Sequence, residues 1–233
     1  MVPGCSVRRS SPREISQKAG GHVPLDRDRV LAAALRLMDA NGLDALTMRK
    51  LASELDVEAM SLYYHVPGKA ALLEGLAECV LAEVQLPSGE AGDWQEASRA
   101  VARALRDNAR AHPHAMPLIA SLGLGSSAAR HHTEDVLGVL GSAGLAPHAA
   151  FTAFLVIRSY VLGYVLWEIQ HAEAKSAGTI AATEPGLLMT APHLATLATF
   201  IATFDNDAEF ERGLEVVVAG LGAVVLTRGG VLT

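Results

Sequence analysis

The chain has 233 residues, half of them hydrophobic, which is enough to bury one large core or two smaller ones. Only 5% of the residues are aromatic while Ala and Leu abound, and this composition favours helices over sheets. The formal net charge of −6 excludes a protein that is basic over its whole surface.

The cysteine content and the hydropathy pattern both fit a soluble protein in a reducing compartment. Cys5 and Cys79 lie far apart, without CxxC or Cys/His metal spacing, and nothing indicates a disulfide framework. The longest apolar run that we identify, residues 216–226, is too short to span a bilayer. Residues 1–24 lack the apolar stretch of a secretory signal. We therefore expect a soluble, cytoplasmic protein.

Residues 1–24 contain four bases and one acid among Ser, Pro and Gly, a composition typical of a disordered basic arm. Such an arm is either an inert tail or a segment that contacts nucleic-acid phosphates or the minor groove.

The first predicted helix begins after Asp26, which can cap it, and ends at Asn41-Gly42, where Gly is free to adopt positive φ. Its apolar stripe is formed by Leu31, Ala34, Leu35 and Met38.

The stretch LTMRKLASELDVEAMSLYYHVPGK, residues 46–69, predicts two short helices joined by a tight turn. Thr47 can cap the first helix, and Asp56 tolerates the left-handed conformation that a sharp turn needs. The second helix starts near Glu58 and ends before Pro67. Its strong core residues are only Leu62 and Val66, so most of its side chains must face outward. A short, exposed helix of this kind fits the second helix of a helix-turn-helix, which enters the DNA major groove.

Residues 31–73, LAAALRLMDANGLDALTMRKLASELDVEAMSLYYHVPGKAALL, resemble the N-terminal signature of the tetracycline-repressor (TetR) family of transcriptional regulators. Two further stretches, GDWQEASRAVARALRDNAR and YVLGYVLWEIQHAEA, are similar to the tetracycline repressor itself. The resemblance therefore extends from about residue 25 through most of the chain.

The resemblance implies a set of DNA-binding residues. These are Thr47, Arg49, Lys50, Ala59, Met60, Ser61, Tyr63, Tyr64, His65 and Lys69. Tyr63 and His65 match phosphate-contacting positions of the family, and Arg49 suits a bidentate contact to guanine. The tetracycline repressor has a Gln-Pro pair at the positions of Ala59 and Met60. These two side chains can contact thymine methyl groups, but they cannot make the bidentate contact of an amide to adenine. Alternatively, one of the two tyrosine rings packs on the core, and Lys69 is a solvated surface base.

Charge is sparse around this unit. Residues 25–83 contain six basic and ten acidic residues. The contacts to phosphates must therefore come from a few basic side chains, chiefly Arg49, Lys50 and Lys69. We expect a weaker salt dependence of DNA binding than a strongly basic protein shows.

The remaining sequence predicts helices over about 69–84, 94–112, 126–141, 147–173, 193–204 and 208–226, with loops at 87–89 and 174–192. The helix at 69–84 corresponds to the family's connecting helix. We thus expect an all-α protein with a disordered basic arm (1–24), a three-helix helix-turn-helix DNA-binding domain (25–68) and a helical ligand-binding and dimerisation domain (69–228).

The tetracycline repressor's amide and aromatic drug contacts fall on Val101 and Leu105, and its metal-binding histidine falls near Ile119. We therefore expect neither tetracycline nor a metal or other cofactor. His131-His132 point to different sides of a helix, and His112 and His114 lack a third ligand. The expected pocket is mostly apolar and suits a small hydrophobic molecule. Its residues are Leu105, Met116, Ile119, Leu122, Val136, Leu140, Arg158, Tyr160, Tyr164 and Trp167.

Each pocket residue has an alternative role as plain core. Arg158 lies in an apolar stretch, where it either pairs with a carboxylate or helix C-terminus or meets an anionic group of a ligand.

The last helix and the helix at 147–173 are too apolar for a monomer's core alone, and we expect them to pair with their copies in a homodimer, as the family resemblance also implies. The residues concerned are Phe210, Leu214, Val217, Val218, Leu221 and Val225.

The resemblance implies a ligand-responsive regulator, which we expect to be a repressor that binds a palindromic operator as a homodimer and is released by a small hydrophobic molecule. The alternative is a helical protein-interaction module without DNA binding. An enzyme is not expected, because no phosphate-binding Gly loop, GxSxG or HExxH motif is present.

Overall fold

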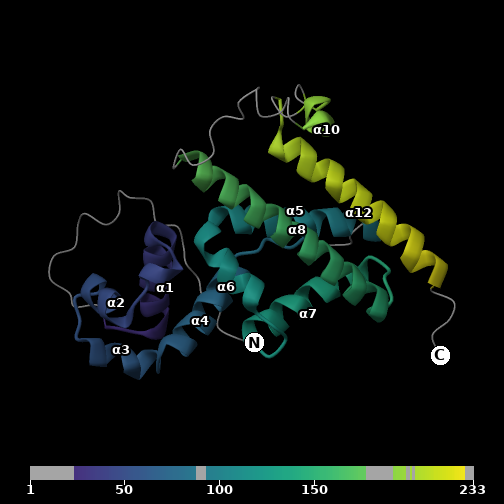
Figure 1. Ribbon diagram of the computed structural model, residues 1–233. Coiled ribbons are helices and arrows are strands. Elements are labelled where there is room, and N and C mark those ends of the chain that lie inside the picture. The colour runs from purple at the N-terminus through teal and green to yellow at the C-terminus, as the bar shows by residue number, and fades with distance from the viewer. Residues whose placement is uncertain (1–23, 88–92, 177–190, 198–199, 201–202, 229–233) are drawn as a thin grey trace, which may run out of the picture. The chain divides into compact units, whose positions relative to one another are not determined.

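The computed structural model describes the chain outside residues 1–23, 88–92, 177–190, 198–199, 201–202 and 229–233. Every regular element within the described residues is a helix, as the composition predicts (Figure 1). The chain divides into two compact units, one formed by Met1–Val84 and Ala111–Glu134, the other by Gln85–Arg110 and Asp135–Thr233.

The first unit starts with α1 (Arg27–Asn41), η1 (Leu43–Ala45), α2 (Met48–Glu54), α3 (Ala59–His65) and α4 (Lys69–Ala82). The predicted caps are confirmed: Asp26 accepts from the Arg29 N–H at the start of α1, and Thr47 accepts from the Lys50 N–H at the start of α2. Asp56 makes the turn between α2 and α3 with a φ of 52°. The short 3₁₀ helix η1 was not predicted.

The core of the first unit forms around α1, whose Leu31, Ala34, Leu35 and Met38 are buried as predicted. A Cβ at Gly75 of α4 would lie 2.7 Å from Leu31 Cδ2. The absence of a side chain at this position therefore lets α4 approach α1 closely.

After α5 (Trp94–Ala111), the first unit continues with η2 (Pro113–Ala115), α6 (Met116–Ser121) and the start of α7 (Ser127–Ser142). The first turn of α7 is bonded to α4. Glu74 accepts from the Ala128 N–H at 3.1 Å and from the hydroxyls of Ser126 and Ser127 at 2.9 and 3.1 Å. Glu74 therefore caps a helix that lies more than fifty residues away in sequence.

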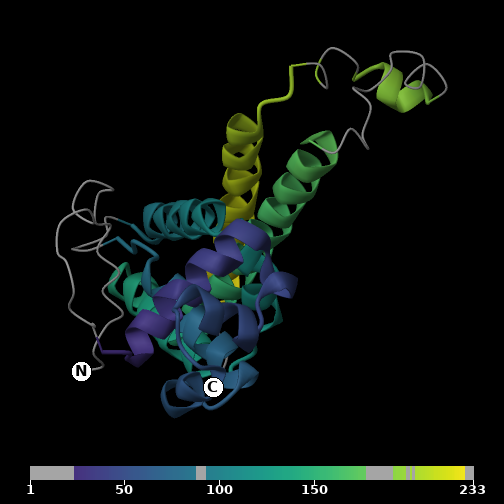
Figure 2. The same cartoon turned by 90° about the vertical axis from the view of Figure 1, so that its left-hand side faces the viewer.

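The second unit contains α5, α8 (Pro147–Ser176), α10 (Pro192–Ala195) and α12 (Asn206–Arg228). The helices α8 and α12 lie side by side in both views (Figures 1 and 2). Three of the predicted helix limits differ. Helix α8 continues to Ser176 rather than ending near residue 173. The helix expected from 193 to Phe204 is interrupted, since α10 ends at Ala195 and a turn follows at Thr196 and Leu197.

The start of α12 is also earlier than predicted, because Asp205 rather than a later residue supplies the cap. Its carboxylate accepts from the Asp207 and Ala208 N–H groups at 2.9 and 3.2 Å. The predicted arm at 1–24 lies outside the described residues except at its last position. Of the predicted loop at 174–192, the first three residues belong to α8, residues 177–190 lie outside the described residues, and Pro192 begins α10.

The interpretation of residues 216–226 as the longest apolar stretch was wrong. Residues Pro147–Ala172 of α8 are long and apolar enough to cross a bilayer by length and composition. However, α8 packs on α12 and carries the buried Glu168 in an ion pair with Arg106, and the core helix of a soluble protein passes the same test of hydropathy.

Candidate nucleic-acid interface

The third helix exposes nearly all of its large side chains. Leu62 and Val66 are 0% and 1% exposed, whereas Met60 is 70% exposed and Tyr64 is 87% exposed. Tyr63 is 44% exposed, so neither tyrosine ring is buried in the core. Because seven residues with a single fully buried side chain add little core, the position of α3 is explained by what it presents to solvent.

The rest of the predicted DNA-binding set lies on the same unit. Arg49, Lys50 and Lys69 are exposed, and Ala59, Ser61 and His65 are half-buried. The hydroxyl oxygen of Thr47 caps α2, and its O–H is free to donate outward. These positions place three exposed bases and several hydrogen-bonding side chains on α2, α3 and the start of α4.

Polar contacts tie α1 to α4 within the first unit. Arg27 donates to Glu78 at 2.8 Å, and Glu78 also accepts from Ser127. At the other end of α1, the His112 ring lies between Asp39 Oδ2 at 3.0 Å and Glu83 Oε2 at 3.2 Å. Helix α4 is thus bonded directly to α1 near the start of α1. Near the end of α1, the His112 ring joins Asp39 to Glu83, the residue that follows α4.

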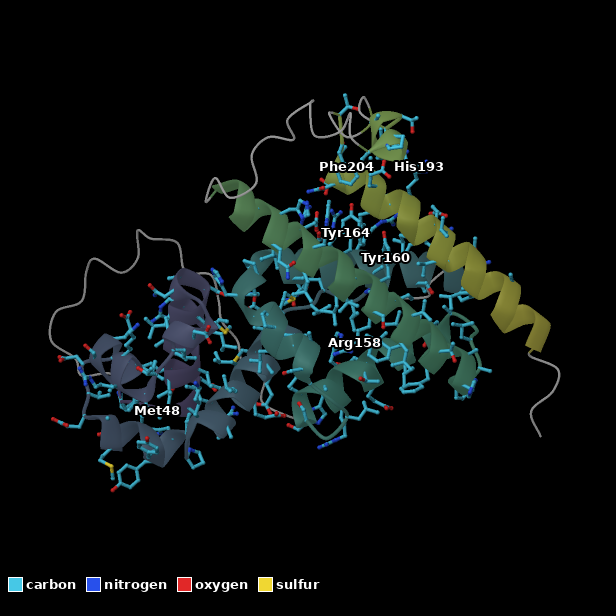
Figure 3. The ribbon with its side chains drawn as sticks, viewed as in Figure 1. Met48, Arg158, Tyr160, Tyr164, His193 and Phe204 are labelled. Atoms are coloured by element: carbon cyan, nitrogen blue, oxygen red, sulfur yellow. The ribbon has the colours of Figure 1, made fainter. Side chains whose placement is uncertain are left out.

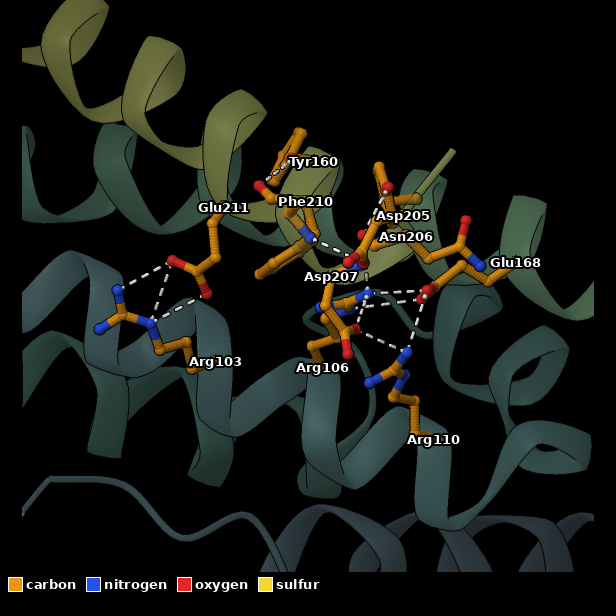
Figure 4. A network of polar contacts seen from close by, with 12 residues as sticks. Arg103, Arg106, Arg110, Tyr160, Glu168, Asp205, Asn206, Asp207, Phe210 and Glu211 are labelled. Carbon is orange, nitrogen blue, oxygen red and sulfur yellow. Dashed lines mark hydrogen bonds and ion pairs between the residues drawn. The ribbon is translucent and has the colours of Figure 1, made fainter. Parts of the chain in front are cut away.

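In the second unit, Arg106 of α5 is the centre of a buried polar network (Figure 4). Its guanidinium donates to Glu168 of α8 at 2.7 Å and pairs with Asp207 of α12 at 2.9 Å. The guanidinium also lies 4.1 Å from the centroid of the Phe210 ring, a cation–π distance. Burial lowers the pKa of Arg106, but the hydrogen bond and charge of Glu168 outweigh it, and the pKa is raised.

Two more arginines extend this network along the surface. Arg103 binds Glu211 at 2.9 Å and Arg99 binds Glu215 at 2.7 Å. These bonds set the register of α12 against α5.

Tyr160 and Tyr164 lie between α8 and α12 (Figure 3). Their hydroxyls donate to the carbonyls of Phe210 and Asn206 at 2.7 and 2.9 Å. Burial raises the pKa of Tyr160 to about 12, so its phenol remains a neutral donor. A Cβ at Gly213 would collide with the Tyr160 hydroxyl, which explains the Gly in the middle of α12.

The predicted pocket residues are distributed over both units, and the pocket remains a prediction. Met116, Ile119 and Leu122 belong to the first unit, and the other seven belong to the second. Met116, Ile119, Val136 and Leu140 are buried, while Leu105, Leu122, Arg158, Tyr160 and Tyr164 are half-buried. Trp167 is 37% exposed.

Most of the predicted dimerisation residues are buried by contacts within the chain: Phe210, Leu214, Val218 and Leu221 are at most 5% exposed. Val217 is half-buried, and Val225 lies outside the residues whose side chains are described. The exposed apolar side of α12 is instead marked by Val216, which is 72% exposed.

Sequence analysis missed Glu74, which caps α7, and the carboxylates Glu168 and Asp207 with their partner Arg106. A signal was present, since bases at 99, 103, 106 and 110 and acids at 207, 211 and 215 form two complementary helical stripes. Among the described residues, no group of three or more His, Cys, Asp or Glu side chains is arranged to hold a metal ion.

A three-helix unit that presents α3 to solvent, followed by a helical body, defines a DNA-binding transcriptional regulator of the helix-turn-helix class. Comparison with family models agrees. Residues 30–76 match the bacterial regulatory proteins of the tetR family, and residues 86–225 match the tetracyclin repressor-like C-terminal domain. The chain belongs to the TetR family of transcriptional regulators, and it is a ligand-binding regulator rather than an enzyme.

Several characterised proteins are similar over most of their length. The transcriptional repressor DrrR1 of Streptomyces coeruleorubidus is 34% identical, covering 88% of this chain and 80% of that protein. The class A tetracycline repressor of Escherichia coli is 34% identical over 84% of this chain and 90% of its own. Among solved structures, the Streptomyces coelicolor protein ActR in complex with actinorhodin is 34% identical, with a TM-score of 0.73 over 86% of this chain and 98% of ActR.

A tetracycline-repressor variant from Acinetobacter baumannii in complex with minocycline is 28% identical, with a TM-score of 0.64 over 86% of this chain and 98% of that one.

Proposed function

We propose that the protein is a cytoplasmic repressor that binds a palindromic operator as a homodimer and leaves it when a small hydrophobic effector binds in the helical body. The observation that carries the proposal is the composition of α3, which buries Leu62 and presents Met60, Tyr63 and Tyr64. DrrR1 and the tetracycline repressors, which are similar along most of the chain, are named as repressors.

The predicted contacts divide into two kinds. Tyr63, His65 and Lys69 would contact phosphates and fix the register on the duplex, whereas Arg49, Ala59 and Met60 would read base edges. Because Met60 is apolar and 70% exposed, thymine methyl groups are its best-matched partners.

Dimerisation is supported by an open face on α8 and α12. Val216 is exposed, and an added Cβ at Gly163 of α8 or at Gly220 of α12 would meet nothing within 4 Å. Small residues let helices pack closely across such a face. Two subunits are also what a palindromic site needs, since recognition helices about 34–36 Å apart fit successive major grooves.

Release by an effector is supported by the relatives that bind actinorhodin and minocycline. A binding event in the body lowers operator affinity only if the two sites share a coupling free energy. The contacts of Glu74 and Glu78 with the start of α7 are candidates for carrying it, because α7 continues into the second unit.

The proposed division of labour keeps the arm at 1–24, the DNA-binding domain at 25–68 and the effector and dimerisation domain at 69–228, with α4 as the connecting helix. The contacts of α4 with α1 and α6 group this helix with the first compact unit.

The test is selection of bound sequences from random duplex DNA at two salt concentrations, with the purified full chain. We expect a palindrome whose half-sites are about one helical turn apart. Tyr63→Ala should abolish the enrichment, whereas Phe151→Ala, a matched truncation in the body, should leave it intact. No enrichment from folded, dimeric protein would contradict the proposal.

A further inference from the structure

An aromatic chain runs through the second unit and ends at the surface. Six of the eleven Phe, Trp and Tyr residues form it, in a protein with only 5% aromatic residues. Neighbouring ring centroids are 5.3–5.7 Å apart along the order Tyr160, Phe210, Tyr164, Trp167, Phe204 and Phe200. A contiguous arrangement of this kind concentrates ring surface in one place.

The two ends of the aromatic chain differ in burial. Toward the inner end, Phe210 is 0% exposed, and the Arg106 guanidinium lies over its ring. At the outer end Trp167, Phe204 and Phe200 are 37%, 39% and 41% exposed. Three large rings that are in contact and are exposed to a similar degree form an apolar patch. Isolated exposed rings, by contrast, would need no explanation.

The elements that carry the outer rings are fixed from inside. The Tyr164 hydroxyl is bonded to Asn206 O, and Arg106 joins Glu168 of α8 to Asp207 of α12. Trp167 lies one residue before Glu168, and Phe204 lies directly before the Asp205 cap of α12. Trp167 and Phe204 therefore lie next to residues held by this polar base, whose contacts Figure 4 shows, and the Phe200 ring lies against that of Phe204.

We infer that Trp167, Phe200 and Phe204 form a binding site for a planar, fused-ring aromatic molecule. The site accepts such a molecule by stacking and edge-to-face contact, which favour flat rings over an aliphatic chain of equal area. The polar base contains two guanidiniums and two carboxylates paired with one another, so it offers no uncompensated charge and suits a neutral ligand. This inference rests on the proposed function for its biological meaning, since it names the chemical class of the effector.

Sequence analysis assigned Trp167 and the two tyrosines to an effector pocket but did not include Phe200, Phe204 or His171. The His171 ring, 4.3 Å from that of Trp167, extends the same surface. The tyrosines are assigned here to the support of the site, because their hydroxyls are bonded to backbone carbonyls of α12.

The two tryptophans provide the experiment. Trp94 is 8% exposed and Trp167 is 37% exposed, so Trp94→Phe leaves Trp167 as the single tryptophan reporter at the site. We would titrate this variant with 1,4-dihydroxyanthraquinone and follow Trp167 emission, with 1-decanol, a neutral aliphatic molecule, as a competitor. We expect saturable quenching by the anthraquinone that 1-decanol does not reverse.

Matched variants localise the binding. Phe204→Ala should weaken anthraquinone binding by about 3- to 10-fold, the loss of one aromatic pair. Phe151→Ala, which removes a ring of α8 outside the aromatic chain, should leave it unchanged. Circular dichroism induced in the bound anthraquinone gives a second readout that works with the wild-type chain and does not depend on the folding of the Trp94 variant.

The outcomes separate this inference from the proposed function. Quenching with retention of operator DNA supports the site and contradicts the effector role within the proposed function. Operator binding without quenching, or equal losses from the two phenylalanine variants, overturns the site alone. Trp167 emission that is already shielded from acrylamide in the dimer and unchanged by the anthraquinone would mean that a second copy covers the rings, which also overturns it.

Discussion

At the scale of single residues, the paired charges of the second unit differ greatly in burial. The side chains of Arg106 and Glu168 are 7% and 9% exposed, whereas those of Arg103 and Glu211 are 44% and 42% exposed. The same pair of chemical groups therefore contributes differently at two places on one helix, because water screens only the second pair.

Arg106→Met should lower the free energy of unfolding by about 3 kcal/mol, because it leaves Glu168 buried with only the longer 3.3 Å bond to Arg110. Arg103→Met, the matched control, should cost no more than about 1 kcal/mol. Urea denaturation followed by circular dichroism measures both. Equal losses would show that Arg106 is not a structural centre.

Two residues of α3 should affect DNA binding in different ways. Tyr63→Phe removes a phosphate donor and should weaken binding by about 2- to 10-fold for every operator variant alike. Met60→Ala should instead change the preference at particular base pairs. Binding assays against a set of single-base operator variants distinguish the two. A base-dependent effect of Tyr63→Phe would contradict its assignment to phosphate.

At the scale of elements, α4 is positioned by a missing side chain and by one carboxylate. Gly75 lets it approach Leu31 of α1, and Glu74 caps α7. Hydrogen bonds from the Ala128 N–H, and then from the hydroxyls of Ser126 and Ser127, hold the pKa of Glu74 below its ordinary value.

Gly75→Ala should destabilise the first unit by about 1–3 kcal/mol, because the new methyl group would meet the fully buried Leu31 side chain. Gly138→Ala in α7 is the matched control. Its Cβ would meet nothing within 4 Å, so the gain in helix propensity should stabilise the protein by about 0.5–1 kcal/mol. Thermal unfolding should therefore shift in opposite directions, and a shift in the same direction would refute the close-approach argument.

The Glu74 cap should make part of the stability depend on pH. Since its folded pKa is lowered, the charged carboxylate stabilises the fold above its ordinary value of 4.5, and this contribution is lost as pH falls below it. Glu74→Gln keeps an acceptor but removes the charge. The difference in unfolding free energy between the two proteins should be constant from pH 7 to about 5.

Below pH 4.5 this difference should shrink. Urea titrations at a series of pH values test this, and a difference that grows on acidification would have the wrong sign.

At the scale of the whole molecule, the open face of α8 and α12 is where we expect the second subunit. Leu155 and Val156 of α8 are 45% and 39% exposed, and Val216 of α12 is 72% exposed. These apolar side chains add to the small residues Gly163 and Gly220, whereas Leu214 and Val218 are committed to the chain's own core.

Val216→Glu should convert the dimer into a folded monomer, because it places a charge in an apolar interface while removing nothing from the subunit core. Analytical ultracentrifugation measures the mass, and operator affinity should fall together with it. Glu134→Lys, an exposed change on α7, is the control. A Val216 variant that remains a dimer would move the interface to another face.

The amino-acid sequence by itself determined the local structure and the class of the protein. The helix limits near Asp26, Thr47 and Gly42 follow from caps and φ preferences, which act between neighbouring residues. The excess of exposed side chains on α3 follows from its amino-acid composition. The family likeness was also evident from the sequence, since the contiguous signature at residues 31–73 carries most of it.

Tertiary structure decided which of the apolar and charged residues meet. Phe210 and Leu214 have the pattern of an interface but are buried in the chain's own core, because a helical stripe does not reveal whether its partner is the same subunit or another. Arg106, Glu168 and Asp207 come from three helices and are separated by as many as 101 positions, and the aromatic chain likewise joins α8 to α12. Contacts of that range depend on how helices pack, which the periodicity of each helix alone does not specify.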